Sequence, residues 1–107
     1  DAGFDWPDAS GPRAKIDEEL AELDQVVDEG RNAGRLEAEL GDLLFSVVNL
    51  ARHLDTDPET ALRRANERFE RRYAHLENAL ATRGIEPATA SPELLDQLWV
   101  AAKAGIP

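Results

Sequence analysis

One stretch of the chain decides its fold: residues 36–54, which read LEAELGDLLFSVVNLARHL. Apolar residues recur in this stretch at intervals of three and four, the spacing of one face of an α-helix. The apolar arc is unusually wide, and such an arc predicts contacts on two sides, as in a central bundle helix or a dimer seam. We therefore expect a helix over residues 35–54 within an all-α fold, and a chain that forms a homodimer or higher homo-oligomer.

Three further segments carry helix signals. Apolar residues from Ile16 onward repeat at helical spacing, Thr56 and Glu59 have the spacing of a capping box, and Ser91 precedes a proline suited to a first helical turn. No convincing strand pattern occurs, so the chain is expected to form one domain, a four-helix bundle. The expected elements are an N-terminal arm over residues 1–12 and helices over 13–30, 57–83 and 92–103.

Composition limits the classes of partner. Acidic residues outnumber Lys and Arg 22 to 12, and the net charge of −10 opposes docking on nucleic acid or on an anionic membrane. No apolar run approaches the roughly 20 residues that span a bilayer. We expect a soluble, cytoplasmic protein without nucleic-acid or membrane partners. The lack of any Met, including an initiator, predicts a fragment or processed chain from which an upstream domain is missing.

Two pairs of acidic residues lie at the margins of the apolar stripes on successive expected helices, Glu19-x-x-Glu22 and Glu39-x-x-Asp42. Residues three apart on a helix differ by about 60° around the axis and about 4.5 Å along it, so both members can reach one ligand. In an antiparallel hairpin the four carboxylates would converge into an all-oxygen site suited to Mg²⁺ or Mn²⁺. Pairs at this spacing also arise easily among 22 acids, so solvated helix faces are the alternative.

Basic residues flank the apolar stripes of the last two expected helices. Arg68 and Arg72 are four apart on one of them, and Lys103 follows Trp99 by four residues on the other. Guanidinium and ammonium groups beside an acidic metal cluster are suited to holding a polyphosphate bridged to metal. The alternative is that Arg68 and Arg72 form surface ion pairs with neighbouring glutamates.

Three residues are candidates for contacts with a nucleotide base. Trp99 offers a stacking surface, although a tryptophan at such a position is more often part of the core. Trp6 lies on the expected arm, where it either stacks on a base or pins the arm to the bundle. Asn66 flanks the apolar stripe of its helix on the side opposite to the arginines.

Several other chemistries lack their residues. Neither His53 nor His75 has an acidic residue three positions before it, as the di-iron helical bundles require. The sequence contains no EF-hand loop, no P-loop and no Cys. Nucleophilic catalysis therefore has no evident agent.

Five runs of sequence, taken in order, resemble the MazG nucleoside triphosphate pyrophosphohydrolases. The resemblance covers nearly the whole chain and includes the family's E-x-x-E and E-x-x-D motifs, separated here by the sixteen residues 23–38. In two-domain members the segment is similar to the C-terminal, catalytic copy. Arg68 is a departure, because relatives often carry Lys there. The runs are GFDW (3–6), KIDEELAE (15–22), ELGDLLF (39–45), VNLARHL (48–54) and ANERFERR (65–72).

The resemblance implies Mg²⁺-dependent hydrolysis of NTPs or dNTPs to the monophosphate and pyrophosphate, a house-cleaning of the nucleotide pool, by an all-α domain that works as a dimer. In this interpretation the two acidic pairs hold one or two Mg²⁺ ions that bridge the phosphates and activate a water. Glu18 either accepts the proton of that water or is a solvated acid. Arg68, Arg72 and Lys103 grip the triphosphate and offset the charge of the leaving pyrophosphate, and Trp99, Trp6 and Asn66 contact the base.

Two rival functions follow from the same pattern. One is a non-catalytic MazG-like module that dimerises or regulates a missing domain, against which the presence of all four acids argues. The other is a narrow-specificity dUTP or dCTP hydrolase of the same superfamily. Base choice depends on the shape of the pocket, so the sequence pattern separates these enzymes poorly.

Overall fold

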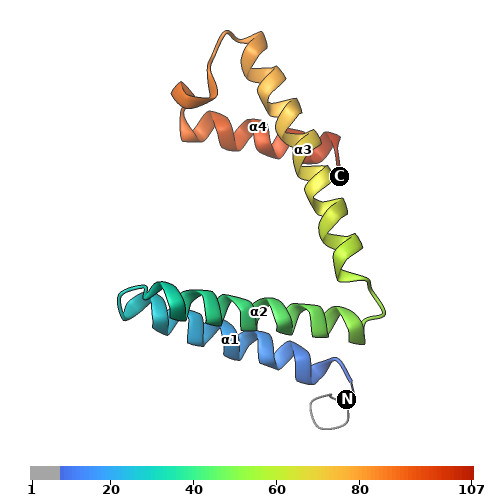
Figure 1. Cartoon of the computed structure of the whole chain (residues 1–107). Coiled ribbons are helices and arrows are strands. Elements are labelled where there is room, and N and C mark those ends of the chain that lie inside the picture. Colours follow the sequence, from blue (N-terminus) through green and yellow to red (C-terminus); the bar gives the residue numbers. More distant parts are fainter. Residues whose placement is uncertain (1–7) are drawn as a thin grey trace. The chain divides into compact units, whose positions relative to one another are not determined.

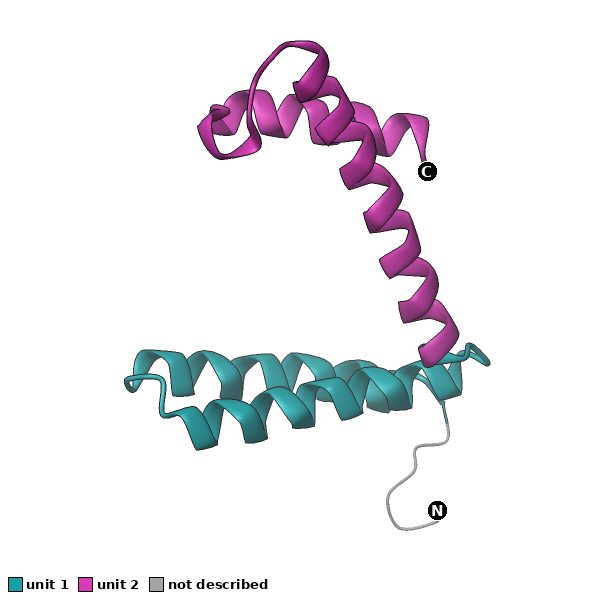
Figure 2. Ribbon diagram, turned by 45° about the horizontal axis from the view of Figure 1, so that its top comes forward, with its two compact units in different colours: residues 1–58 teal, residues 59–107 magenta. Residues whose placement is uncertain are grey.

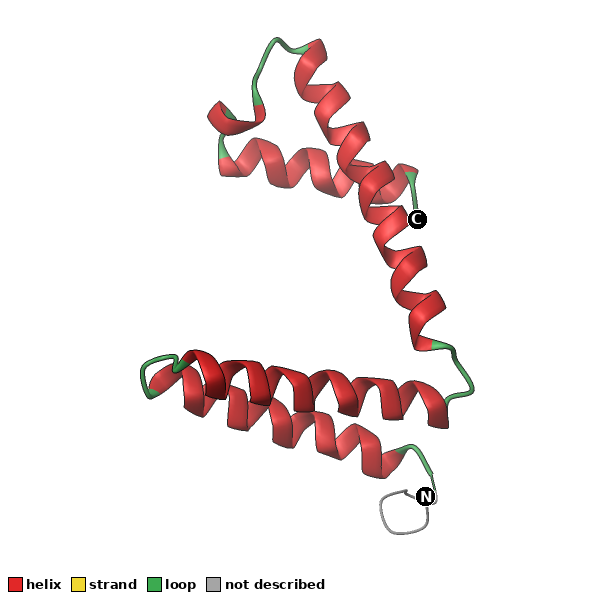
Figure 3. Ribbon diagram, viewed as in Figure 1, coloured by secondary structure: helices red, strands yellow, loops and turns green. Residues whose placement is uncertain are grey.

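The computed structural model describes residues 8–107, and within them it contains helices and no strand, which confirms the all-α class (Figure 3). None of the helices in this described part is both long enough and apolar enough to cross a membrane. The elements are α1 (Ser10–Asp28), α2 (Ala33–His53), α3 (Pro58–Thr82), the short 3₁₀ helix η1 (Pro87–Thr89) and α4 (Pro92–Gly105), labelled in Figure 1.

The chain divides into two compact units, of which the first ends at Pro58 and the second covers Glu59–Pro107 (Figure 2). The first unit contains α1 and α2, and the second contains nearly all of α3 together with η1 and α4. The expectation of one domain over the whole chain stays a prediction.

The helix boundaries differ from the expected ones mainly at two places. Helix α1 begins at Ser10, so residues 10–12, expected in the arm, are helical. Pro12 is tolerated there because the first turn of a helix has no intrahelical partners for its N–H groups. The expected loop between α3 and α4 contains η1, whose Thr89 hydroxyl donates to the carbonyl of Glu86 at 3.0 Å.

Left-handed glycines end two of the helices. After α3, Gly84 has φ +68°, its N–H donates to the carbonyl of Ala81, and the N–H of Ile85 donates to the carbonyl of Leu80, both at 3.0 Å. This pair of bonds is a Schellman motif, which satisfies carbonyls that the helix leaves free. Gly30, with φ +112°, follows α1 in the same way. Helix α3 thus ends at Thr82, one residue before the expected end at residue 83.

Helices α1 and α2 of the first unit lie side by side as an antiparallel hairpin (Figures 1 and 2). At the turn, the side chain of Asn32 caps α2 by accepting the N–H of Arg35, and the Arg35 guanidinium pairs with Glu29 at 2.7 Å. Val26 is buried in this unit. The hairpin turn sets the register between α1 and α2, and with it the positions of the acidic pairs.

In the second unit, α3 and α4 pack around a small apolar core of Leu76, Leu80 and Leu98. Ser91 caps α4 by accepting the N–H of Leu94 at 3.1 Å. This confirms the expected start of the last helix.

Candidate metal centre

Three of the four motif acids of α1 and α2 come together, as expected for a hairpin, whereas Glu22 is grouped only with acids of α1. The structure gives two groups in which one carboxylate oxygen from each residue lies within 4.8 Å of the others. One group comes from α1 alone and the other joins the two helices, and Glu19 belongs to both. The groups are Glu18, Glu19 and Glu22, and Glu19, Glu39 and Asp42.

Burial makes Glu19 the centre of this arrangement. Only 3% of Glu19 is exposed, and its Oε2 has no hydrogen-bond partner; the buried Oε2 of Glu39 has none either. A buried acceptor left unsatisfied costs about 1–3 kcal/mol, and more when it is charged. A divalent cation with oxygen ligands would satisfy both atoms, so the residues fit Mg²⁺ or Mn²⁺. The solvated-face alternative is wrong for Glu19, whereas Glu18 and Asp42 are exposed.

The negative charges of the cluster act on one another. The pKa of Glu22 is raised, first by the charge of Glu19, then by partial desolvation and by a hydrogen bond with Glu39. Such repulsion opposes folding, and a bound cation would remove it.

Lys15 is a member of this cluster that the sequence reading did not single out. Its ammonium donates to Oε1 of Glu18 and contacts Oε1 of Glu19, both at 3.1 Å. These contacts raise the pKa of Lys15, with the Glu19 hydrogen bond as the largest cause and the Glu18 bond next. The available signal was the spacing, because residues three and four apart on a helix are neighbours.

The basic candidates belong to the second unit. The Nε–H of Arg72 donates to the backbone carbonyl of Ile106 at 2.8 Å, so this side chain also supports the C-terminal end of α4. The ion pair expected as the alternative is not the contact found for Arg72. Arg68 is half-buried, and Asn66 and Lys103 are exposed.

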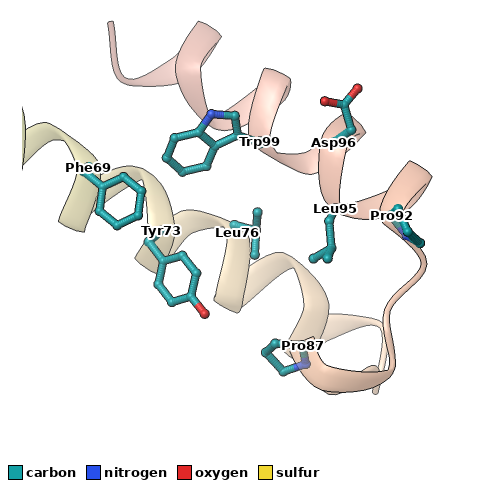
Figure 4. A pocket seen from close by; sticks show the side chains of 8 residues that line it. All are labelled: Phe69, Tyr73, Leu76, Pro87, Pro92, Leu95, Asp96 and Trp99. Atoms are coloured by element: carbon teal, nitrogen blue, oxygen red, sulfur yellow. The ribbon is translucent and has the colours of Figure 1, made fainter. Parts of the chain in front are cut away.

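Trp99 lines an open apolar pocket of about 580 Å³ within the second unit. Its ring lies 5.3 Å from that of Phe69, which in turn stacks on Tyr73 at 6.0 Å between centroids. Trp99 also packs against the core cluster of this unit, as the alternative for this residue expected. Trp6 lies outside the described residues. The pocket is lined by Phe69, Tyr73, Leu76, Pro87, Pro92, Leu95, Asp96 and Trp99 (Figure 4).

Comparison with known proteins identifies similar sequences over nearly the whole chain. The family described as "MazG nucleotide pyrophosphohydrolase domain" matches residues 12–77. A "Nucleoside triphosphate pyrophosphohydrolase" of Escherichia coli (strain K12) is 45% identical over 105 residues, which are 94% of this chain and 39% of that protein. The "Nucleoside triphosphate pyrophosphohydrolase/pyrophosphatase MazG" of Thermotoga maritima is 45% identical over 103 residues, 96% of this chain and 39% of that protein.

A shorter match is the "Uncharacterized protein YabN" of Bacillus subtilis (strain 168), 44% identical over 68 residues, which are 64% of this chain and 14% of that protein. The chain thus spans well under half the length of these curated relatives. The family match includes both acidic pairs and ends within α3.

Proposed function

This chain belongs to the MazG nucleotide pyrophosphohydrolase family, and from that membership we propose that it hydrolyses NTPs or dNTPs to the monophosphate and pyrophosphate with Mg²⁺. Two relatives carry names for nucleoside triphosphate pyrophosphohydrolysis. The observation that carries the proposal is the pair of buried, unpartnered oxygens on Glu19 and Glu39. A role in clearing unwanted nucleotides from the pool is part of this proposal.

The four motif acids are the proposed metal ligands: Glu19, Glu22, Glu39 and Asp42. When bound, Mg²⁺ supplies Lewis-acid neutralisation of phosphate charge and activation of water. Glu19 is central because it belongs to both groups of carboxylates. Glu18 is exposed and has one oxygen bonded to Lys15, which leaves its other oxygen to take up a proton from water.

Arg68, Arg72 and Lys103 are proposed to hold the triphosphate. Lys103 is exposed and carries its charge on a flexible stem, which suits a point contact with a phosphate oxygen. In Arg72, the bond from Nε to the Ile106 carbonyl fixes the guanidinium and leaves its terminal N–H groups for phosphate oxygens. For the base, Trp99 is the first candidate because it lines an open apolar pocket, and Asn66 and Trp6 stay candidates.

The products of a nucleotide panel test this proposal. Incubation with each NTP and dNTP plus Mg²⁺, followed by anion-exchange chromatography, should yield the monophosphate and pyrophosphate. ADP and orthophosphate from ATP would refute the position of cleavage. Turnover of a single pyrimidine dNTP would favour the narrow-specificity enzyme, and no turnover of any nucleotide would favour the non-catalytic module.

A matched pair of variants connects the assay to the site. Glu39→Gln keeps the side-chain volume and removes one charge of the cluster, so it should abolish turnover. Glu37→Gln makes the same change at an exposed position of α2 outside both carboxylate groups, and it should leave turnover unchanged.

A further inference from the structure

The two groups of carboxylates differ in how their charge is balanced. In the group of Glu18, Glu19 and Glu22, two members already contact the ammonium of Lys15 at 3.1 Å. In the group that Glu19 forms with Glu39 and Asp42, no ion pair of the described residues reaches either α2 acid. Because the groups share Glu19, Lys15 contacts two members of the first group but only one member of the second.

The carboxylate oxygens without a hydrogen-bond partner also distinguish the two groups. Glu19 uses Oε1 for Lys15, whereas its Oε2 is buried without a partner, and Glu39 also has a buried, unpartnered Oε2. A cation that binds between α1 and α2 satisfies two orphaned acceptors, neither of which is in contact with Lys15. A cation that binds Glu18, Glu19 and Glu22 competes with Lys15 for oxygens of two of its three ligands.

We propose that the Lys15 ammonium is a built-in counter-ion of the Glu18, Glu19 and Glu22 group. A divalent cation therefore binds first to the group of Glu19, Glu39 and Asp42. It enters the other group only by displacing Lys15. The proposal deepens the proposed function and rests on its metal centre. Lysine suits this role because its charge is compact, its stem is flexible, and 37% of this side chain is exposed, so the ammonium can turn toward solvent. An anionic triphosphate offers the displaced ammonium a second place to bind.

Removal of the lysine charge tests this order of binding. The full chain is titrated with Mn²⁺ in the absence of nucleotide, and free Mn²⁺ is followed by electron paramagnetic resonance. The wild type should show one tight class of site and a second, weak class. Lys15→Gln should strengthen the second class by about tenfold or more, because a positive charge 3.1 Å from oxygens of two of its ligands is gone. Lys15→Arg, which keeps the charge, should stay close to wild type.

A matched control comes from the same helix. Arg13 pairs with Asp17 at 2.9 Å, with the same i,i+4 spacing as Lys15 and Glu19. The side chains of Arg13 and Asp17 are both well exposed, and neither residue belongs to either of the two groups of carboxylates. Arg13→Gln therefore removes one positive charge from α1 without touching the cluster. It should leave both Mn²⁺ classes unchanged, which separates the local effect of Lys15 from net charge.

A second substitution locates the strengthened class. In Lys15→Gln/Glu18→Gln the second class should disappear while the first stays, because Glu18 belongs to only one of the two groups. Glu18→Gln alone should likewise remove only the weak class, and it serves if Lys15→Gln lowers helicity in circular dichroism. The Glu18→Gln variant keeps Lys15, so the carboxylates near Lys15 remain neutralised. It therefore tests which group of carboxylates forms each class of Mn²⁺ site without added repulsion among them.

Other outcomes overturn the proposal at distinct points. Equal Mn²⁺ binding by wild type and Lys15→Gln would show that Lys15 does not compete. Weakening of both classes in Lys15→Gln would show that the lysine positions Glu19 for metal instead. Loss of the tight class in Glu18→Gln would refute the assignment of that class to Glu19, Glu39 and Asp42. A wild type that binds no Mn²⁺ would refute the metal centre itself, and with it the proposed function.

Discussion

Glu19 of α1 and Glu39 of α2 each bury one carboxylate oxygen that has no hydrogen-bond partner, and ligand oxygens of the two residues lie within 4.8 Å of each other. Two anions held this close in a partly desolvated site repel one another. The fold therefore stores an unfavourable interaction in its first unit, and a divalent cation would relieve it.

Magnesium should raise the melting temperature of the wild-type chain. At a Mg²⁺ concentration about a hundred times Kd, mass action gives about 2.7 kcal/mol of stabilisation, which corresponds to several degrees for a domain of this size. Glu39→Gln should flatten this response and leave the chain without added metal as stable as wild type or more stable. Differential scanning calorimetry in EDTA and in Mg²⁺ measures both effects. A Glu39→Gln variant with the full Mg²⁺ shift would eliminate the shared site.

The charge on Glu22 should make stability depend on pH. Its pKa in the folded chain is raised above 4.5, mainly by Glu19, so the folded chain holds the Glu22 proton more tightly than the unfolded chain does. The stability that this group contributes is fully present below pH 4.5 and is lost as pH rises through the raised pKa. Without metal, Glu22→Gln should therefore be more stable than wild type at neutral pH, and the difference should shrink on acidification.

Glu29 is a matched control for Glu22, because its pKa is shifted in the opposite direction and stability should therefore depend on pH in the opposite sense. The Arg35 guanidinium, followed by Gln25, lowers its pKa below 4.5. Its contribution is therefore present above pH 4.5 and is lost as pH falls through the lowered pKa. Urea unfolding of Glu22→Gln and Glu29→Gln in EDTA between about pH 4 and 7 measures both contributions. A difference between Glu22→Gln and wild type that does not change with pH would contradict the repulsion.

Lys103→Ala should lower kcat/KM by roughly ten- to a thousand-fold, the span expected for losing about 1.5–4 kcal/mol of charge-assisted contact with the triphosphate. Lys103 is exposed, so the melting temperature should not change. Arg72→Ala should lower kcat/KM over the same range and also destabilise the chain by about 1 kcal/mol, because the Ile106 carbonyl loses its donor. Steady-state kinetics and thermal melts of both variants separate the two effects. An unchanged kcat/KM in both variants would show that Lys103 and Arg72 do not bind the triphosphate.

Self-association should involve the apolar face that α1 leaves uncovered on α2. The exposed large side chains of this helix are Leu40, Leu44, Phe45, Val47 and Val48. Multi-angle light scattering should give a mass of at least twice 11.8 kDa at micromolar concentration. Phe45, which is 68% exposed, is the best single position to test, and Phe45→Glu should yield a single-chain mass with unchanged helicity. A single-chain mass for the wild type would contradict this interpretation of the wide apolar arc.

Local signals explain which parts of the fold were predictable. Gly84 and Ser91 act through neighbouring backbone groups, so their sequence positions predict the helix ends that the structure has. Gly11 and Pro12 belong to the segment expected as an arm, yet both lie within α1, because Pro disturbs a first turn little. The bond between Arg72 and Ile106 joins residues 34 positions apart, and no local pattern announces such a contact.

The carboxylate cluster, like the fold, has features that local sequence predicts and features that depend on packing between helices. Two acidic pairs on successive helices predict convergence once a hairpin is assumed, and the hairpin is present. How deeply Glu19 is buried depends on how α1 packs against α2, and the spacing of acidic residues along the sequence does not predict this packing. Phe69 and Tyr73 line an open pocket, because the side of α3 on which they lie is only partly covered within its unit, and helical spacing alone does not show this.

The hairpin turn has a consequence for the order of folding. All five carboxylates of the cluster lie between Glu18 and Asp42, in two helices joined by one tight connection. Contacts between such near neighbours in sequence close small loops, which form quickly and cost little chain entropy. The proposed metal ligands would then come together while later segments are still unstructured, and a divalent cation captured at that moment would act as a nucleus that holds α1 against α2 before α3 and α4 are in place.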